Sequence, residues 1–412
     1  MKISFIIPSR NNLKYLEWAY NSIRKNQGNH KVQICVADDA SEDGTWDWCK
    51  EKMDEDPYFN AIQNKGPKRL GLVILNDKLV NEVAKYDVCI VYHADMYLCP
   101  GALDSIEEHM YSVAADGISV QYIKKPKTIV SLTRIEPPLH PPGPEKILKD
   151  YGIEPEEFKE DLLLNNLGSS DFTGPGLNTT TEGIFAPWAF WKKDFQEIGG
   201  HDIVFAPQSK EDSDIFNRFH LNGTKFVQTW EGFVYHMTSR GSRFNPYSGG
   251  APGQNSQEWI GTTTRNTKEF IRKWGHMIKH DNFMKPIVPP KYEIGIVVEN
   301  CTPQLLEALE PWCNYIYVDM EEFVVYSIKE QENSSFNIDE RVRGFDPNKH
   351  VIKDNITIKV DGNTFGNEEF RHIQNISEII QYSGEIGEFE LDNLKIQIND
   401  LTTYENDLII TK

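Results

Sequence analysis

Cysteine is scarce in this chain, and its cysteines are not paired along the sequence. The six cysteines lie at positions 35, 49, 89, 99, 301 and 313, and none forms a Cys-x-x-Cys pair. Neither a structural zinc site nor the disulfide framework of a small secreted domain is therefore indicated. Reduced thiols in a cytoplasmic protein are the expectation that follows.

Long hydrophobic runs are lacking as well. No apolar stretch approaches the roughly 18 residues that a membrane-spanning helix needs, so we expect no transmembrane segment. The apolar start Met1–Pro8 is too short for the core of a secretory signal, and no small-residue cleavage site follows it. This start is predicted to be the first strand, and the protein is predicted to be cytoplasmic.

Basic residues are outnumbered by acidic ones. The chain carries 43 Lys and Arg against 62 Asp and Glu, which gives a formal net charge of −19. Nucleic acid is therefore excluded as a bulk electrostatic partner, because phosphate backbones require a basic face. With 412 residues, 39% of them hydrophobic and 25% charged, the composition is typical of a soluble globular protein of two or three domains.

Strands and helices are expected to alternate through the first part of the chain. Apolar runs predict strands over Lys2–Ile7, Val32–Ala37, Phe59–Gln63, the start of Val88–Met96 and Gly117–Ile123, and helical spacing predicts helices near 13–23, 46–53, 70–85 and 101–113. This order is typical of a parallel sheet with crossover helices. No Gly-x-Gly-x-x-Gly follows the first strand, so a dinucleotide fingerprint is absent.

The stretch Val88–Met96 ends in two side chains that bind metals. His93 and Asp95 stand one residue apart just past an apolar run that reads as a strand buried on both faces. Ligands of open parallel sheets bind outside the carboxyl ends of the strands. The two residues are thus placed to hold a divalent cation and a phosphorylated ligand; solvated polar residues at a strand end are the alternative.

The segment Lys124–Thr181 interrupts the alternation. Its proline clusters predict an irregular loop, with one or two short helices over Glu145–Leu167. We interpret it as an insertion, either a lid or acceptor-binding element or a surface excursion. Pro286–Pro290 then reads as a linker that divides a first domain, residues 1–285, from a C-terminal unit, residues 291–412. A structural, oligomerising or acceptor-holding role is expected for this second unit.

Two groups of motifs resemble those of a known family. The first is the strand Ile3–Pro8 with Ser9-Arg10-Asn11, followed by Asp38–Thr45 (DDASEDGT). The second is Gly199-Gly200-His201-Asp202, followed by Glu211-Asp212-Ser213-Asp214. In this order the motifs resemble the inverting family 2 glycosyltransferases of the GT-A fold, over about residues 1–275. The resemblance implies an α/β fold, GT-A and Rossmann-like, with a mostly parallel sheet and flanking helices. The C-terminal unit, outside this resemblance, is expected to be a smaller α+β domain.

The resemblance also implies roles for single residues. Asp39 would contact the nucleotide base or ribose, with Pro8 and Arg10 lining the same pocket, and Asp95, preceded by Ala94, would bind the metal. Asp212 would be the catalytic base, with Glu211 as its alternative. His236, later in the sequence, would be a metal ligand. His93 stands where the family motif usually has its first Asp, as a third metal ligand or a ribose contact.

Other residues are singled out by their chemistry alone. Arg240 and Arg243 would clamp the diphosphate, although a solvated basic loop is an equal alternative. Arg69, with Lys68, would face the nucleotide. Trp188 and Trp191 offer flat faces for a sugar ring, and core packing is the competing role for at least one of them.

The predicted activity is the transfer of one sugar to an acceptor hydroxyl. A UDP-, GDP- or dTDP-sugar would be the donor, and a glycan, a lipid-linked molecule or a protein would be the acceptor. Mn²⁺ is the expected cation, with Mg²⁺ as the second choice, because the ligand set mixes imidazole and carboxylate. The family's processive members carry membrane spans and a Gln-x-x-Arg-Trp motif, and both are absent here.

Two other functions compete with sugar transfer as interpretations of this sequence. A nucleotidyltransferase would carry an early Gly-x-Gly-x-Arg signature, which this sequence lacks. A non-catalytic protein that binds sugar nucleotides or glycans through a degenerate GT-A core stays open, because His93 departs from the family motif.

Overall fold

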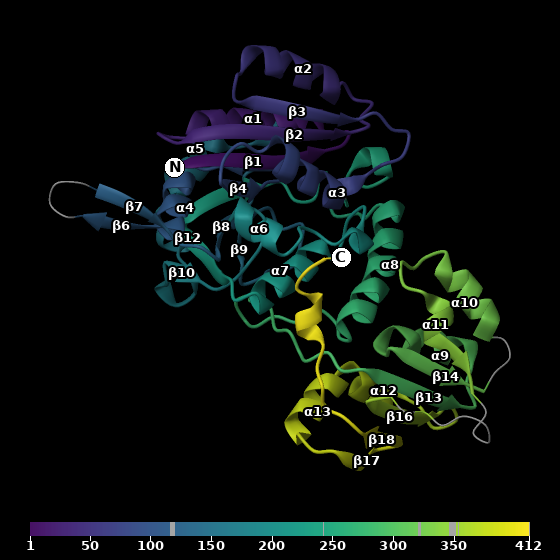
Figure 1. The fold of residues 1–412 in the computed structure, drawn as a ribbon. Coiled ribbons are helices and arrows are strands. Elements are labelled where there is room, and N and C mark those ends of the chain that lie inside the picture. The colour runs from purple at the N-terminus through teal and green to yellow at the C-terminus, as the bar shows by residue number, and fades with distance from the viewer. Residues whose placement is uncertain (116–119, 242, 320–322, 346–351, 353, 412) are drawn as a thin grey trace. The chain divides into compact units, whose positions relative to one another are not determined.

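The computed structural model describes residues 1–115, 120–241, 243–319, 323–345, 352 and 354–411. The chain forms two compact units (Figure 1), and each is described by itself. Unit 1 comprises Met1–Thr262 with His280–Pro286 and the end of the chain from Thr411, and unit 2 comprises Thr263–Lys279 and Ile287–Ile410. Residues 263–279, expected in the first domain, thus group with the second unit.

Unit 1 is built on one large mixed sheet, whose strands lie in the order β10-β12-β8-β11-β4-β1-β2-β3, with β5 on β12 and β9 on β8. The pairs β1–β2, β2–β3, β1–β4, β8–β12 and β8–β9 are parallel. The strands are β1 (Lys2–Ser9), β2 (Lys31–Asp39), β3 (Phe59–Asn64), β4 (Val88–Val91), β5 (Met96–Leu98), β8 (Thr128–Glu136), β9 (Lys146–Leu148), β10 (Thr180–Thr181), β11 (Trp188–Trp191) and β12 (Lys225–His236).

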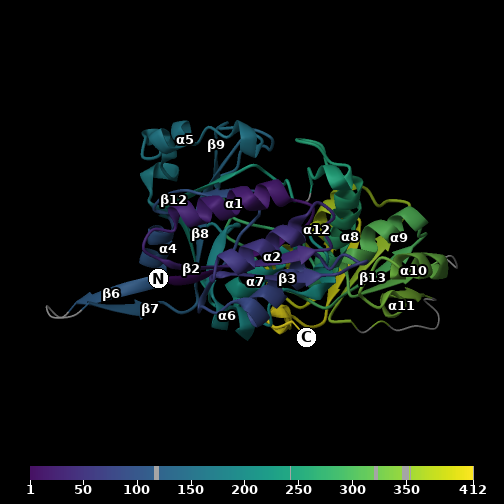
Figure 2. The same cartoon turned by 90° about the horizontal axis from the view of Figure 1, so that it is seen from above.

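Helices flank this sheet (Figures 1 and 2). They are α1 (Leu13–Asn26), α2 (Thr45–Glu55), α3 (Gly71–Lys78), which continues as the π-helix η1 (Leu79–Val83), α4 (Ala102–Met110), α5 (Glu160–Asn166), α6 (Lys192–Glu197) and α7 (Glu211–Leu221). Helix α8 (Gln257–Trp274) begins in unit 1 and ends in unit 2. Short 3₁₀ helices are η2 (Pro155–Glu157), η3 (Ser170–Phe172), η4 (Pro175–Leu177), η5 (Ile203–Phe205) and η6 (Pro246–Ser248).

The central strands explain why the alternating pattern folds this way. All four residues of β4 are buried, and in β2 every residue after Lys31 is buried. Strands covered on both faces need continuous apolar runs, and these are the runs seen in the sequence. The fold class predicted from sequence, a mostly parallel GT-A-like α/β sheet with a separate C-terminal unit, is confirmed.

Strand β8 corrects the interpretation of residues 124–181 as an insertion. Thr128–Glu136 lies inside the sheet, antiparallel to β11 and parallel to β12, and eight of its nine residues are buried. The irregular part begins only at Pro137. The β-branched and apolar letters TIVSLTRIE are a strand signal, which the proline clusters beside it obscured.

A hairpin replaces the end of an expected helix. The helix predicted to reach Val113 ends at Met110, and β6 (Tyr111–Ala115) then pairs antiparallel with β7 (Val120–Lys124). Part of the strand expected over Gly117–Ile123 lies outside the described residues. The described strands of this hairpin project from the rest of unit 1 (Figure 1).

Unit 2 has its own six-stranded sheet and core, with the strand order β15-β14-β13-β16-β18-β17. Its strands are β13 (Ile294–Glu299), β14 (Tyr315–Val318), β15 (Val342–Gly344), β16 (Ile356–Asp361), β17 (Gly387–Leu391) and β18 (Leu394–Ile398). Its helices are α9 (Pro303–Leu309), η7 (Glu310–Trp312), α10 (Phe323–Gln331), α11 (Ile338–Arg341), α12 (Asn367–Gln374), α13 (Ile376–Ser383) and η8 (Glu405–Leu408). Among the described residues of both units, no helix has the length and apolarity to cross a membrane.

Candidate active site

One pocket of unit 1 gathers most of the residues singled out in the sequence. Strands β1, β2 and β4 are parallel, so their carboxyl ends meet at one edge of the sheet. Ten of the residues singled out line this pocket: Pro8, Arg10, Asp39, Arg69, His93, Ala94, Asp95, Glu211, Asp212 and His236. Segments that lie far apart in the sequence therefore converge at this edge of the sheet.

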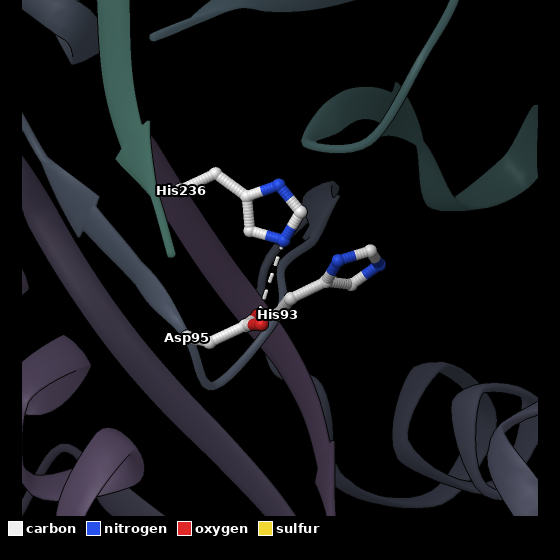
Figure 3. Close-up of side chains that lie close together, drawn as sticks. All are labelled: His93, Asp95 and His236. Carbon is white, nitrogen blue, oxygen red and sulfur yellow. Dashed lines mark ion pairs between the residues drawn. The ribbon is translucent and has the colours of Figure 1, made fainter. Parts of the chain in front are cut away.

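Three side chains in the pocket form a candidate cation site. Each of His93, Asp95 and His236 offers one ligand atom, and these atoms lie within 4.8 Å of one another. Figure 3 shows the three side chains turned toward one another. The Nε2 atom of His236 lies 3.3 Å from Oδ1 of Asp95 but makes no hydrogen bond within the described structure. Two imidazoles and a carboxylate suit a transition metal such as Mn²⁺.

Strand pairing brings these three residues together. His93 and Asp95 lie in the turn between β4 and β5, and β5 pairs antiparallel with the end of β12. In that register His236 stands opposite Met96, next to Asp95. The second oxygen of Asp95, Oδ2, accepts a hydrogen bond from the backbone N–H of Arg240 at 2.6 Å. The carboxylate is therefore fixed on one side and open to a cation on the other.

A buried glutamate lies behind His236. Oε1 of Glu136, the last residue of β8, is 2.7 Å from Nδ1 of His236. Burial acts to lower the pKa of His236, but the charges of Asp95 and Glu136 outweigh it and raise the pKa to about 9. Burial lowers the pKa of His93 to about 4, so this imidazole is neutral at pH 7 and available as a ligand.

The first turn of α7 places two carboxylates at the pocket. Glu211 is buried, and its Oε2 has no hydrogen-bond partner among the described residues, whereas Asp212 is partly exposed. Burial, with Asp212 beside it, raises the pKa of Glu211 to about 8. Burial also raises the pKa of Asp212. When two neighbouring carboxyls differ in burial, the more buried one keeps its proton and the other ionises.

The double-glycine turn anchors that helix. Arg218 of α7 is fully buried and donates to Asp214, to the carbonyl of Ile198 at 3.0 Å and to the carbonyl of Gly200 at 2.6 Å. Gly200 has a φ of +75°, and a Cβ there would meet Oδ2 of Asp77 at 2.2 Å. Glycine is therefore required for the close approach of the turn, which fixes where α7 begins.

Asp39 also lines the pocket. Its carboxylate accepts hydrogen bonds from Nδ2 of Asn64 and from the backbone N–H groups of Leu70 and Gly71 at 3.0 and 2.8 Å. These bonds tie the end of β2 to the start of α3. Nε of Arg69 lies 3.8 Å from Asp39 Oδ2, so a cation lies beside this carboxylate.

Two arginines of the pocket share one exposed acidic partner. Glu258, in the first turn of α8, pairs with Arg69 and lies 3.7 Å from Nη1 of Arg10. Arg10 and Arg69 both line the pocket beside Asp39. The guanidinium groups that face the pocket thus have a carboxylate on their outer side.

Five of the residues singled out do not line this pocket: Lys68, Trp188, Trp191, Arg240 and Arg243. The guanidinium of Arg240 points to the carbonyl of Ile153, at 2.6 Å, and to Glu154. Arg243 donates to Asn255 and stacks on Trp259. Neither arginine lines the pocket, and the predicted clamp of the diphosphate on closure of their loop stays a prediction.

The predicted stacking of a sugar on the two tryptophans is corrected. Trp188 is fully buried against Phe190 and Phe216, and Trp191 is 5% exposed, with its indole N–H bonded to the carbonyl of Lys125. Both rings pack in the core, the competing role expected for at least one of them.

Sequence reasoning missed site residues on β8. Arg134 lines the pocket, and Glu136 stands behind His236. Residues i and i+2 of a strand face the same side, so both follow from placing β8 in the sheet. Asn76 and Gln208 also line the pocket, without any motif that marks them.

One family model and one curated relative match parts of the chain. The family model described as "Glycosyl transferase family 2" matches residues 4–161. Abequosyltransferase RfbV of Salmonella typhimurium is 31% identical over 119 residues, which are 28% of this chain and 34% of that protein. The chain thus spans about a third of the length of this curated relative.

Solved structures give weaker likenesses. The mannosyltransferase PcManGT of Pyrobaculum calidifontis, in complex with GDP-Man and Mn²⁺, is 13% identical with a TM-score of 0.41, covering 66% of this chain and 63% of its own. GalNAc-T7 with UDP, GalNAc and Mn²⁺ is 14% identical with a TM-score of 0.43, covering 66% and 48%. Scores this low carry no argument about the present chain.

The family match runs from within β1 to the first turn of α5, and it includes His93, Asp95 and the strand β8 that follows them. Residues 4–161 of this chain match the model of glycosyl transferase family 2.

Proposed function

We propose that this protein is an inverting glycosyltransferase that moves one sugar from a nucleoside diphosphate donor to an acceptor hydroxyl. The observation that carries the proposal is the convergence of Asp39, Asp95, Asp212 and His236 on one pocket of a domain that matches the family 2 model over residues 4–161. The family match supports the class of reaction, and the geometry of the pocket supports its direct, single-displacement form.

The residues at the strand ends fit a divalent cation. Nε2 of His236 is buried and makes no hydrogen bond within the described residues; it lies 3.3 Å from Oδ1 of Asp95, a carboxylate whose other oxygen is already fixed. Such an atom is costly to bury unless a ligand satisfies it. We propose that His93, Asp95 and His236 hold Mn²⁺. When bound, the cation would neutralise the charge that develops on the leaving diphosphate.

The paired carboxyls support a division of labour at the acceptor. Burial and the neighbouring Asp212 raise the pKa of Glu211 to about 8, so we assign the proton of the pair to Glu211 and the ionised form to Asp212. Asp212 would accept the proton of the acceptor hydroxyl while that oxygen bonds to the anomeric carbon. The bond from this carbon to the phosphate oxygen breaks, and the nucleoside diphosphate leaves with the electron pair. One such displacement inverts the anomeric centre.

Three arginines offer charge for the donor. Arg10, Arg69 and Arg134 line the pocket, and guanidinium groups bind phosphate oxygens through paired N–H donors. Nε of Arg134 is buried and makes no hydrogen bond within the described structure, and it lies 3.4 Å from Oε1 of Glu136. We therefore propose that the diphosphate lies near these three arginines and not near Arg240 and Arg243, where it was first expected.

A donor screen tests the proposal. The full chain would be incubated with UDP-, GDP- and dTDP-sugars and Mn²⁺, and release of the nucleoside diphosphate would be measured with and without glycan, lipid-linked or protein acceptors. Turnover of one donor with inversion at the anomeric carbon is the expected result. Donor binding without turnover under any condition would favour a non-catalytic sugar-nucleotide-binding protein. A cytoplasmic location and homo-oligomerisation through unit 2 stay predictions.

A further inference from the structure

Glu136 is the most enclosed carboxylate near the candidate cation site. Its exposed fraction is 1%, and three nitrogen atoms converge on it. They are Nδ1 of His236 at 2.7 Å, Nζ of Lys146 at 3.1 Å and Nε of Arg134 at 3.4 Å. A carboxylate held by two cations has little freedom to change rotamer, so its contact with the histidine is fixed.

We infer that Glu136 is a positioning residue for the cation site, holding the His236 ring so that Nε2 faces His93 and Asp95. The inference rests on the proposed function, since it concerns the cation of that reaction. Nothing in the sequence motifs marks Glu136, because it lies in the segment first interpreted as an insertion.

The physical argument begins with the two nitrogens of imidazole. When Nδ1–H is donated to a carboxylate, Nε2 is left as the nitrogen that binds a metal. The ring cannot rotate about its Cβ–Cγ bond without breaking the 2.7 Å contact, so the direction of the Nε2 lone pair is set. Carboxylates behind metal-binding histidines act in this way, and losing one typically weakens metal affinity about 10–100-fold.

A purely structural role for Glu136 is the competing explanation. Arg134 and Lys146 are partly buried cations, and any nearby carboxylate would neutralise them. Glu145 provides the matched comparison, because its Oε1 lies 3.1 Å from Nη2 of Arg134 and 3.9 Å from Nζ of Lys146. Glu145 is 7% exposed, and the described contacts do not include one between it and His236. Both glutamates lie near Arg134 and Lys146, but in the described contacts only Glu136 pairs with His236.

The experiment measures Mn²⁺ binding to the full chain by calorimetry, in the absence of nucleotide and sugar. Four variants are compared with the unchanged protein: Glu136→Leu, Glu136→Gln, Glu145→Leu and Glu145→Gln. Glu136→Leu is expected to weaken Mn²⁺ binding about 10–100-fold. Glu136→Gln is expected to lose about 3–10-fold, because the amide oxygen still accepts from Nδ1–H while the negative charge is gone. Both Glu145 variants should stay within about twofold of the unchanged protein.

A spectroscopic readout separates positioning from stability. Co²⁺ absorbs visible light in a manner that depends on its ligands, so its spectrum should change in the Glu136 variants and not in the Glu145 variants. Thermal unfolding in EDTA gives the stability of each variant without metal. Should Glu136→Leu fail to fold, Glu136→Gln decides the matter by calorimetry and spectrum.

Unchanged Mn²⁺ affinity in Glu136→Leu, or in Glu136→Gln where the leucine variant does not fold, would overturn the inference. An equal loss in the Glu145 variant would do the same, because charge alone would then explain the effect. If the unchanged protein binds no Mn²⁺, both the inference and the proposed cation fail together. If it binds Mn²⁺ but turns over no donor, the role of Glu136 stands and the proposed activity fails.

Discussion

The backbone N–H of Arg240 donates a 2.6 Å hydrogen bond to Oδ2 of Asp95, across 145 residues of chain. This bond connects the loop after β12 to the turn after β4. It turns Oδ1 of Asp95 toward Nε2 of His236, at 3.3 Å. One carboxylate therefore joins two loops and offers its free oxygen to the candidate cation site.

Replacing Asp95 by Ala is expected to remove measurable Mn²⁺ binding, because the site then keeps two imidazoles and no anionic ligand. Calorimetry with Mn²⁺ measures this directly. Asp38→Asn is the control, because Asp38 is a buried carboxylate at the end of β2 that bonds the backbone of Ser41. Unchanged affinity in Asp95→Ala would take Asp95 out of the site.

Asp212→Asn is expected to lower turnover about 10²–10⁴-fold, the usual contribution of a general base. Donor affinity should be retained, because the proposed role of Asp212 is at the acceptor hydroxyl. Steady-state kinetics and nucleotide binding are measured on the same preparation. Survival of activity would move the base to another residue, with Glu211 examined next.

Arg134→Gln is expected to weaken nucleoside diphosphate binding about 10–100-fold, the worth of a charge-assisted hydrogen bond of about 1.5–3 kcal/mol. Titration calorimetry with UDP, GDP and dTDP measures the effect. Arg243→Gln is the matched control, because Arg243 stacks on Trp259 and bonds Asn255. If the Arg243 variant loses affinity and the Arg134 variant does not, the first expectation for the clamp was right.

Glu258→Gln is expected to strengthen nucleoside diphosphate binding by about 2–10-fold. The carboxylate now pairs with Arg10 and Arg69, and exposed pairs are worth about 0.2–1 kcal/mol each. Without its charge, both guanidinium groups are available to the ligand. Glu231→Gln, an exposed glutamate of β12, serves as the control. Weaker binding in Glu258→Gln would indicate that Glu258 contacts the nucleotide itself.

Glu211 should make the stability of the protein depend on pH. Its pKa is raised from 4.5 to about 8 in the folded protein, so the folded state binds this proton more tightly than the unfolded state. The stabilisation from this group is complete below about pH 4.5 and is lost as the pH rises toward 8.

Glu211→Gln carries no such proton, so its melting temperature should approach that of the unchanged protein near pH 5 and exceed it above pH 8. Thermal unfolding across this pH range measures the difference between the two proteins. Glu231→Gln should show no such trend, and a constant difference for Glu211→Gln would contradict the assignment.

The sequence by itself determined the class of fold and much of the pocket. Continuous apolar runs such as Val88–Val91 predict strands buried on both faces, and polar residues directly after parallel strands are expected at one edge of the sheet. This reasoning needs only local pattern and a general rule of topology. It predicted that Asp39 and Asp95 lie at one edge of the sheet, and the resemblance to a known family added Asp212.

Only the tertiary structure decided the residues that depend on which strands are neighbours. Glu136 meets His236 because β8 lies beside β12, and Arg134 reaches the pocket from the same strand. The guanidinium of Arg240 faces the carbonyl of Ile153. Which group an arginine faces depends on the packing around its long, flexible side chain. Side-chain direction and strand neighbours are set by contacts between distant segments, and no local pattern of letters encodes them.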